Sequence, residues 1–280
     1  MLKTECLFSG SKGNSILVQS EKASVLIDAG VSCKAIKCAL DERNVDVSSL
    51  KGILVTHEHS DHVKAVGRLC SKFKVPIYAT EAVAKAVYSS VYDKADEANA
   101  FCEMVRTIRE NGVYEIEDMT FSPFPTPHDS VGSVGYVIGE GNEKSLAVAT
   151  DIGFASESVR EAMLGCKKAI VESNHDIYML KNGRYPEFLK ERILSNCGHL
   201  SNDDCAELCK LLIAYGCTDI TLFHMSEDNN TERIAFMTTY KALLEMGVEL
   251  KDEISLSLAP KNVVAPDYRI LKALIGQLNF

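Results

Sequence analysis

The sequence lacks any apolar run long enough to cross a membrane. Its longest runs, such as Gly52–Val55 and Leu146–Ala149, are far shorter than the roughly 20 residues of a membrane helix. The N-terminus also lacks a basic segment leading into an apolar stretch, so no secretory signal is expected. We therefore expect a cytoplasmic protein without a membrane partner.

Cysteine is too sparse for a disulfide scaffold. Ten cysteines occur in 280 residues, and no two are spaced as Cys-x-x-Cys. Cys205 and Cys209 form a helical apolar stripe with Leu208 and Leu212, which predicts buried packing and not metal ligation. The thiols are expected to be reduced.

Positive charge is also in deficit. The chain has 30 basic and 39 acidic residues, which gives a net charge of −9. This balance argues against a sequence-independent binder of duplex DNA, which needs a broad basic face. A local basic patch or bound metal ions could still hold an anionic substrate.

No low-complexity tract, repeat or linker divides the chain, so we expect a single domain over residues 1–280. Strand-like and helix-like patterns alternate in both halves, which favours two sheets flanked by helices. Expected strands cover 15–18, 24–27, 52–56, 76–79, 119–124, 134–138, 145–150, 169–172 and 219–223. Expected helices cover 33–43, 61–72, 82–91, 156–164, 186–194, 202–215 and 231–245.

Metal-competent side chains directly follow one apolar strand, at His57, His59, Asp61 and His62. Imidazole with carboxylate is a ligand set that suits Zn, Fe, Ni or Mn. His57 and His59 are two apart in an extended segment, so they point to one side and can hold one ion. Asp61 and His62 follow on the turn into a helix and can hold another.

The same pattern recurs downstream. Asp151 and His224 each end an apolar, buried-looking strand, as His57 does. His128 follows Pro125-Thr126-Pro127, in which two prolines stiffen the approach. Ligands at strand ends are expected to converge on one rim.

The ordered set His57-x-His59-x-Asp61-His62, His128, Asp151 and His224 resembles the dinuclear metal set of the metallo-β-lactamase superfamily. The resemblance implies an α/β four-layer αββα sandwich with two divalent ions, which can be Zn, Mn or Fe. His57, His59 and His128 would hold the first ion. Asp61, His62 and His224 would hold the second, with Asp151 bridging. Asp28 extends the resemblance to the N-terminal strands as a supporting carboxylate.

Three further stretches, Phe8–Ser15, Glu172–Asp176 and Gly198–Asn202, resemble the YycJ/WalJ-like family of metal-dependent DNA exonucleases. The last two, with His224–Ser226, also resemble ribonuclease Z, where a histidine assists the scissile phosphate. By position that role falls to His199. The arm with which ribonuclease Z holds tRNA has no evident counterpart, so tRNA processing is not expected.

These resemblances predict a two-metal phosphodiesterase, a 5′-to-3′ DNA exonuclease in which a metal-bridging hydroxide attacks in line. The predicted catalytic residues are Asp61, which orients the hydroxide with Asp151, and His199, which donates to the phosphate or leaving oxygen. A purely structural role for His199, just before a helix, is the alternative. DNA is the expected partner and DNA repair the expected setting.

Basic and aromatic residues interleave between Asn174 and Cys197, at Lys181, Arg184, Lys190, Arg192, Tyr178, Tyr185 and Phe188. Such a segment can track a phosphate backbone and stack bases, or it can be a solvated helix face with its aromatics packed inward. The sequence leaves both interpretations open. Predicted substrate contacts are Asn14, His175, Lys190 and Arg192, with a supporting role as the alternative for His175.

Two other functions remain open. The same metal cradle serves hydrolases of small esters, lactones, thioesters or cyclic phosphodiesters, and the acidic net charge favours such a substrate. An inactive regulatory or scaffolding module would show missing ligands, whereas every ligand is present. The sequence does not choose between a monomer and a homodimer, and it assigns no role to residues 265–280.

Overall fold

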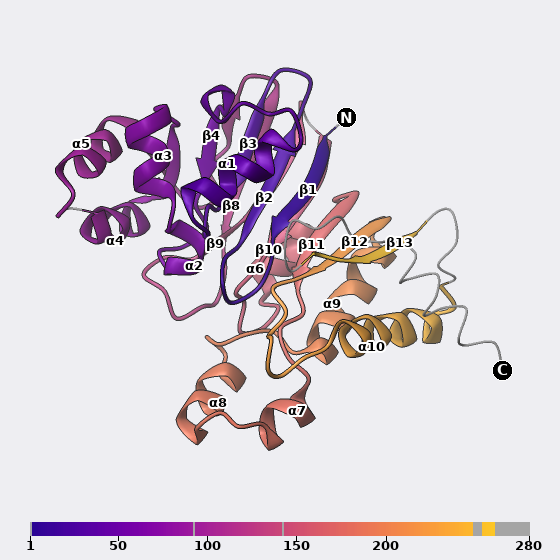
Figure 1. Cartoon of the computed structure of the whole chain (residues 1–280). Coiled ribbons are helices and arrows are strands. Elements are labelled where there is room, and N and C mark those ends of the chain that lie inside the picture. The colour runs from indigo at the N-terminus through magenta and orange to yellow at the C-terminus, as the bar shows by residue number, and fades with distance from the viewer. Residues whose placement is uncertain (1, 92, 142, 249–253, 261–280) are drawn as a thin grey trace.

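The computed structural model describes residues 2–91, 93–141, 143–248 and 254–260, which form two β-sheets with helices on their outer faces (Figure 1). The first sheet has the strand order β1-β2-β3-β4-β5-β6. Its strands are β1 (Lys3–Phe8), β2 (Ser15–Gln19), β3 (Ser24–Ile27), β4 (Gly52–Leu54), β5 (Ile77–Thr80) and β6 (Val105–Ile108). Strands β1 to β3 pair antiparallel, and β3 to β6 pair parallel.

The second sheet has the order β13-β12-β11-β10-β9-β8-β7. Its strands are β7 (Tyr114–Ile116), β8 (Met119–Pro125), β9 (Val134–Glu140), β10 (Glu143–Ala149), β11 (Lys168–Glu172), β12 (Asp219–Phe223) and β13 (Ser255–Leu258). Strands β10 to β13 are parallel, so their carboxyl ends meet at one edge. The other strands of this sheet pair antiparallel.

Helices cover the outer face of each sheet. The first sheet carries α1 (Cys33–Asp41), the short η1 (Val47–Ser49), α2 (Ser60–Val63), α3 (Val66–Phe73), α4 (Glu81–Val91) and α5 (Ala95–Met104). The second carries α6 (Glu157–Met163), α9 (Asn202–Ala214) and α10 (Glu232–Glu245). The remaining two, α7 (Ile177–Asn182) and α8 (Glu187–Leu194), project from the body (Figure 1).

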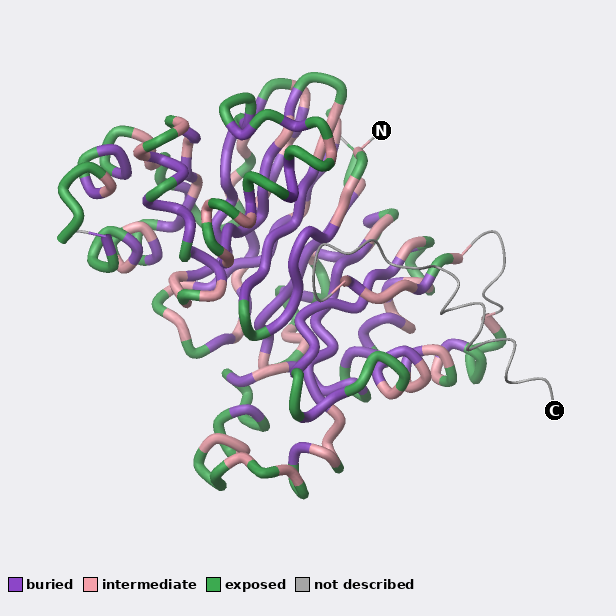
Figure 2. Tube along the Cα trace, viewed as in Figure 1, coloured by how far each residue is buried: buried purple, intermediate pink, exposed green. Residues whose placement is uncertain are grey.

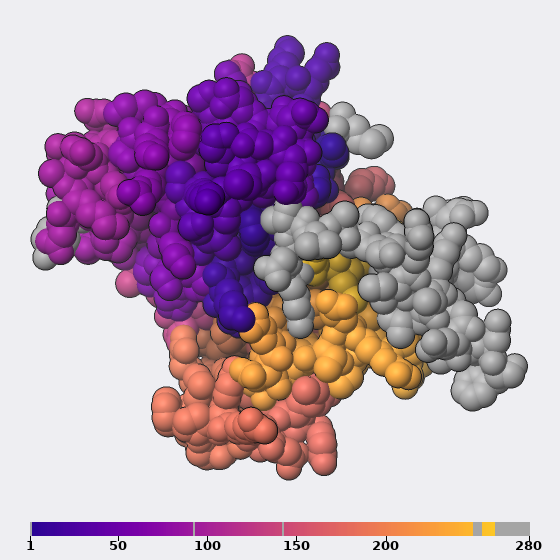
Figure 3. Space-filling view, in the orientation of Figure 1, coloured from indigo at the N-terminus to yellow at the C-terminus, as the bar shows by residue number. Residues whose placement is uncertain are grey.

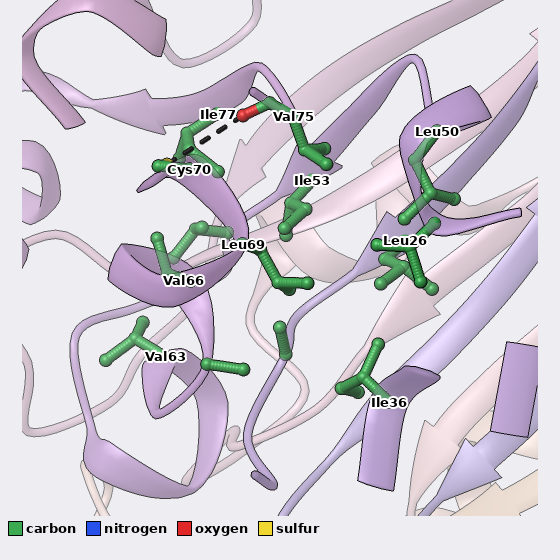
Figure 4. Packing of buried hydrophobic residues seen from close by; sticks show 14 of the residues in the cluster. Leu26, Ile36, Leu50, Ile53, Val63, Val66, Leu69, Cys70, Val75 and Ile77 are labelled. Carbon is green, nitrogen blue, oxygen red and sulfur yellow. Dashed lines mark hydrogen bonds between the residues drawn. The ribbon is translucent and has the colours of Figure 1, made fainter. Parts of the chain in front are cut away.

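The central strands, such as β4, β11 and β12, are apolar on both faces because each sheet is covered on both sides there. In β4, Ile53 packs under the helices of the first sheet, whereas Leu54 joins the core between the two sheets. Figure 4 shows Ile53 and Leu26 packed with Ile36 of α1 and Leu69 of α3. The buried strands run through the centre of the molecule in Figure 2. The predicted αββα sandwich is therefore confirmed.

The prediction of one continuous helix over 61–72 is wrong. The chain forms α2 and α3, and the N–H of Ala65 donates to the carbonyl of Ala29 at 2.9 Å, outside any helical hydrogen bond. This contact ties the second helix to the turn after β3. Sequence reasoning also missed β1, β6, β7, β13, α5 and α7, most of them short or at sheet edges. No helix among the described residues is both long and apolar enough to span a membrane.

Candidate metal centre

Three strands lead into residues with an unusual backbone conformation. Asp28 follows β3 with φ of 60°, Asp151 follows β10 with φ of 54°, and His224 follows β12 with φ of 55°. Residues other than glycine rarely adopt positive φ, and such strained turns concentrate at functional sites. All three side chains reach one buried cluster of histidines and carboxylates.

The structure brings together the seven side chains predicted as ligands. Ligand atoms lie within 4.8 Å of one another in each of four sets: His57 with His59 and His128, Asp61 with His62 and His224, His57 with His62 and Asp151, and Asp151 with Glu172, His199 and His224. The third set shares a member with each of the first two. These overlapping sets fit a divalent metal site.

Besides both ring nitrogens of His175, two buried imidazole nitrogens lack a hydrogen-bond partner among the described residues: Nε2 of His57 and Nε2 of His224, both in the cluster. Buried polar atoms are normally hydrogen-bonded, so these two point to a missing partner. The other nitrogen of each ring is fixed: His57 Nδ1 lies 2.9 Å from Thr56 Oγ1, and His224 Nδ1 lies 2.8 Å from Glu172 Oε1. Metal-binding histidines have this arrangement, and the imidazole and carboxylate donors fit a divalent ion such as Zn, Mn or Fe.

Further oxygens orient the other rings. Asp28 Oδ2 lies 2.7 Å from His62 Nδ1, and the same carboxylate accepts from the N–H and the hydroxyl of Thr56, each at 2.8 Å. The Gly198 carbonyl lies 3.1 Å from His128 Nδ1. Asp28 is thus placed where sequence reasoning expected a supporting carboxylate.

Glu172 is a site residue that sequence reasoning missed. It ends β11 and is fully buried. Its Oε1 lies 2.8 Å from Nδ1 of both His199 and His224, and its Oε2 accepts from the N–H groups of Ile152 and Leu200. The available signal was the apolar run Ala169–Val171 ending in a carboxylate, the same pattern that marked Asp151 and His224.

The electrostatics of the cluster favour a cation. Burial raises the pKa of Asp151, but the imidazoles of His224 and His62 outweigh burial and hold that pKa well below its usual value. Burial lowers the pKa of His62, and the carboxylates of Asp151 and Asp28 reverse this and raise it well above its usual value. Burial also lowers the pKa of His224, but the carboxylates of Asp151, Asp61 and Glu172 outweigh burial and raise that pKa to about 10. The carboxylates of the cluster therefore favour positive charge at its centre, as a bound cation would supply.

A cleft of ≈ 230 Å³ opens over this cluster. Its described lining is Ser11, His59, Asp61, Asp151, Asn174, Tyr185, Arg192, Ile193, His199, His224 and Ser226. The two residues predicted to be catalytic, Asp61 and His199, thus share one cleft.

The four predicted substrate contacts lie in different places. Arg192 lines the cleft and donates from Nε to Asp129. Asn14 is buried, with Nδ2 3.0 Å from His62 Nε2, so its amide supports the ligands. Neither His175 nor Lys190 is among the described residues that line the cleft.

The contacts and burial of His175 and Lys190 account for their positions outside the cleft. Lys190 Nζ donates to the Lys181 carbonyl at 2.8 Å and lies 3.6 Å from Glu187, so its charge is directed between α7 and α8. His175 is 1% exposed, and burial lowers its pKa to about 4. Neither side chain therefore lines the described cleft, and a substrate contact by either one stays a prediction.

Comparison with known proteins agrees with this site. The family model described as "Beta-lactamase superfamily domain" matches residues 23–225. The exodeoxyribonuclease YycJ of Bacillus anthracis is 36% identical over 241 residues, covering 86% of this chain and 89% of its own. The exodeoxyribonuclease WalJ of Streptococcus pneumoniae is 35% identical over 254 residues, covering 89% and 92%. The crystal structure of the metallo-β-lactamase fold protein YhfI from Bacillus subtilis superposes with a TM-score of 0.68 at 16% identity, covering 93% and 97%.

The chain therefore belongs to the β-lactamase superfamily and has the metallo-β-lactamase fold. Together with the clustered ligands, this makes it a metal-dependent hydrolase that binds divalent metal. The family resemblance predicted from the histidine spacing is confirmed.

Proposed function

We propose that this hydrolase is a two-metal phosphodiesterase that removes nucleotides from the 5′ end of DNA. The relatives named exodeoxyribonuclease, at 35–36% identity over most of both chains, support this substrate class. The observation that carries the proposal is the position of His199, in the cleft beside the predicted ligands and held through Nδ1 by Glu172. A fixed imidazole there suits a phosphodiester, whose leaving oxygen needs a hydrogen-bond donor.

The ligand groups divide between two ions. His57, His59 and His128 would hold one ion, and Asp61, His62 and His224 the other, with Asp151 between them. When bound, the ions would supply Lewis-acid polarisation of the phosphoryl group and acidify a water. The seven side chains bind and orient these ions.

The chain's own residues position the substrate. His199 donates a hydrogen bond from Nε2 to the scissile phosphate or its leaving oxygen, because Glu172 holds Nδ1. Arg192 places a guanidinium at the cleft, and Asp129 steadies it from the other side. Asn14 keeps Asp61 in place, since its Nδ2 lies 3.4 Å from Asp61 Oδ2.

The test compares digestion of 5′- and 3′-labelled single-stranded DNA, duplex DNA and RNA, alongside turnover of bis(p-nitrophenyl) phosphate. Each substrate is tried with Mn²⁺, with Zn²⁺ and with a chelator, using the wild type, Asp61→Ala and His199→Ala. We expect DNA to shorten from its 5′ end only with metal, and not with Asp61→Ala. His199→Ala is expected to slow digestion by about 10²- to 10⁴-fold.

Turnover of the small diester without digestion of any polymer would contradict the exonuclease. It would favour the other candidate left open by the sequence, a hydrolase of small esters, thioesters, lactones or cyclic phosphodiesters. Digestion unchanged by His199→Ala would remove that residue from the mechanism.

A further inference from the structure

The α7–α8 pair exposes its aromatic side chains. Phe188 is 71% exposed and Tyr178 is 75% exposed, the largest values among the exposed aromatic residues described. A solvated helix pair that packed its aromatics inward would show the opposite. Figures 2 and 3 show this pair as a largely exposed lobe at the bottom of the molecule. The two rings are therefore available to a ligand.

The lobe adjoins the candidate active site. Phe188 and Arg192 are four residues apart in α8, which puts their Cβ atoms roughly 5–6 Å apart on one helix face. Arg192 lines the cleft over the metal centre, so Phe188 lies about one helical turn from its rim. Tyr185, between the two helices, lines both this cleft and a neighbouring hollow of ≈ 530 Å³. A polymer leaving the cleft on this side meets the lobe.

The charge of the lobe suits a polyanion. Residues 177–194 contain four basic and two acidic residues, in a chain whose net charge is −9. Lys181 and Arg184 are exposed, and their side chains form no ion pair with any described residue. In the neighbouring hollow, Glu227 is paired with Lys12 at 2.7 Å and Asp228 accepts from the Tyr185 hydroxyl at 2.9 Å. Two basic groups are thus left for phosphates beside the exposed rings.

We propose that Phe188 and Tyr178 form a base-stacking platform for the single-stranded end of a nucleic acid whose terminus lies in the cleft. This proposal rests on the proposed nuclease function. Apart from the terminal pair, bases in a duplex have both faces covered by their neighbours, so successive bases can stack on these rings only where the strand is unpaired. Stacking is tolerant of sequence, because every base has a π-face.

The absence of tryptophan allows a direct test of the platform. Phe188→Trp would introduce the single tryptophan of the full-length, metal-loaded protein. Its emission is followed while an oligodeoxythymidylate with phosphorothioate linkages, which resist hydrolysis, is added. We expect saturable quenching by this single strand, and much less by a blunt duplex or by inorganic polyphosphate.

Tyr215→Trp is the matched control. Tyr215 is 59% exposed and follows α9, before β12 begins, whereas the metal centre lies beyond the carboxyl end of β12. Its emission is expected to stay constant as the oligonucleotide is added. In binding assays, Phe188→Ala should raise the dissociation constant of the single strand by about 5- to 150-fold, while Phe188→Tyr and Tyr215→Ala should bind as the wild type does.

Constant emission from Phe188→Trp with every oligonucleotide would overturn the platform. So would equal quenching of the two tryptophan variants. A blue shift that depends on protein concentration, without nucleic acid, would show that a second copy covers the lobe and would also overturn it. Quenching without DNA digestion would contradict the exonuclease alone, and digestion without quenching would contradict the platform alone.

Discussion

Glu172 and His199 are joined by a contact of 2.8 Å between Oε1 and Nδ1. The same oxygen lies 2.8 Å from Nδ1 of His224. One buried carboxylate thus fixes the ring of a predicted metal ligand and the ring of the predicted hydrogen-bond donor. Because the partner of Nδ1 leaves Nε2 of each ring for a metal or a substrate, we expect Glu172 to affect both metal binding and substrate binding.

Glu172→Gln tests this coupling. The glutamine amide ends in one oxygen and one NH2 donor, so it loses either the contacts to both rings or the hydrogen bonds accepted from the Ile152 and Leu200 N–H groups. Metal affinity or activity should therefore fall about 10- to 100-fold. Metal affinity is measured by competition with a chromophoric chelator, and activity by kcat/KM on bis(p-nitrophenyl) phosphate. Glu103→Gln is the control, since Glu103 is exposed and lies 3.7 Å from Lys74. Equal values for wild type and Glu172→Gln would exclude a positioning role.

The pKa of Glu172 predicts how the unfolding free energy of the metal-free, chelator-treated protein changes at acid pH. Burial raises its pKa, but His199 and His224 outweigh burial and lower the pKa from 4.5 to about 2. A depressed pKa in the folded state gives stability that is present above pH 4.5 and lost as the pH falls toward 2, on the order of 3 kcal/mol in all. Urea unfolding is measured from pH 6 to pH 2.5. The difference in unfolding free energy between wild type and Glu172→Gln should become smaller as the pH falls. A difference in unfolding free energy that stays constant with pH would contradict the lowered pKa of Glu172.

Asp28 predicts a second effect on metal binding. Its carboxylate lies 2.7 Å from Nδ1 of His62, whose other nitrogen faces Asp61 and Asp151. Asp28→Asn removes this charge and should weaken metal binding about 10- to 100-fold. Asp41→Asn provides the control, because Asp41 is exposed and pairs with Lys37 in α1. Unchanged affinity in Asp28→Asn would show that His62 does not need this partner to bind metal.

The sequence predicted the sandwich and the seven side chains that the structure brings into one cluster, because metal-competent residues follow apolar strands. Glu172 follows the same rule, yet it was quoted only as part of a family-like stretch. Its role depends on contacts with His199 and His224, which lie 27 and 52 residues away and whose approach only the fold reveals. The sequence also did not decide whether Phe188 is exposed, since periodicity does not show whether a helix projects from the body.

The direction of Lys190 could not be predicted for a related reason. A basic residue beside aromatics is compatible with phosphate binding, but the turn between α7 and α8 brings the Lys181 carbonyl within 2.8 Å of its ammonium. The break between α2 and α3 likewise depends on a tertiary contact, the hydrogen bond from the N–H of Ala65 to the carbonyl of Ala29. Local patterns located the site, and distant contacts decided the role of each side chain around it.

Gly30 holds the turn that carries Asp61 close to the first sheet. A Cβ at position 30 would lie 1.5 Å from the Asp61 carbonyl oxygen and 2.7 Å from the Asn14 amide nitrogen, both backbone atoms. Gly30→Ala should therefore cost about 3 kcal/mol or more in unfolding free energy and weaken metal binding. Gly132→Ala is the control, because its nearest neighbour is the rotatable hydroxyl of Thr80 at 3.3 Å. Equal urea midpoints for the two variants would contradict this packing.

We expect the paired ligand sets to make a two-metal exonuclease. The most direct measurement is a titration of the chelated full-length chain with Mn²⁺ or Zn²⁺, in which digestion of 5′-labelled single-stranded DNA is followed at each metal equivalent. We predict that digestion from the 5′ end reaches its plateau at about two equivalents, the number that the two ligand sets hold. A plateau at one equivalent, or no digestion at any metal content, would contradict the account.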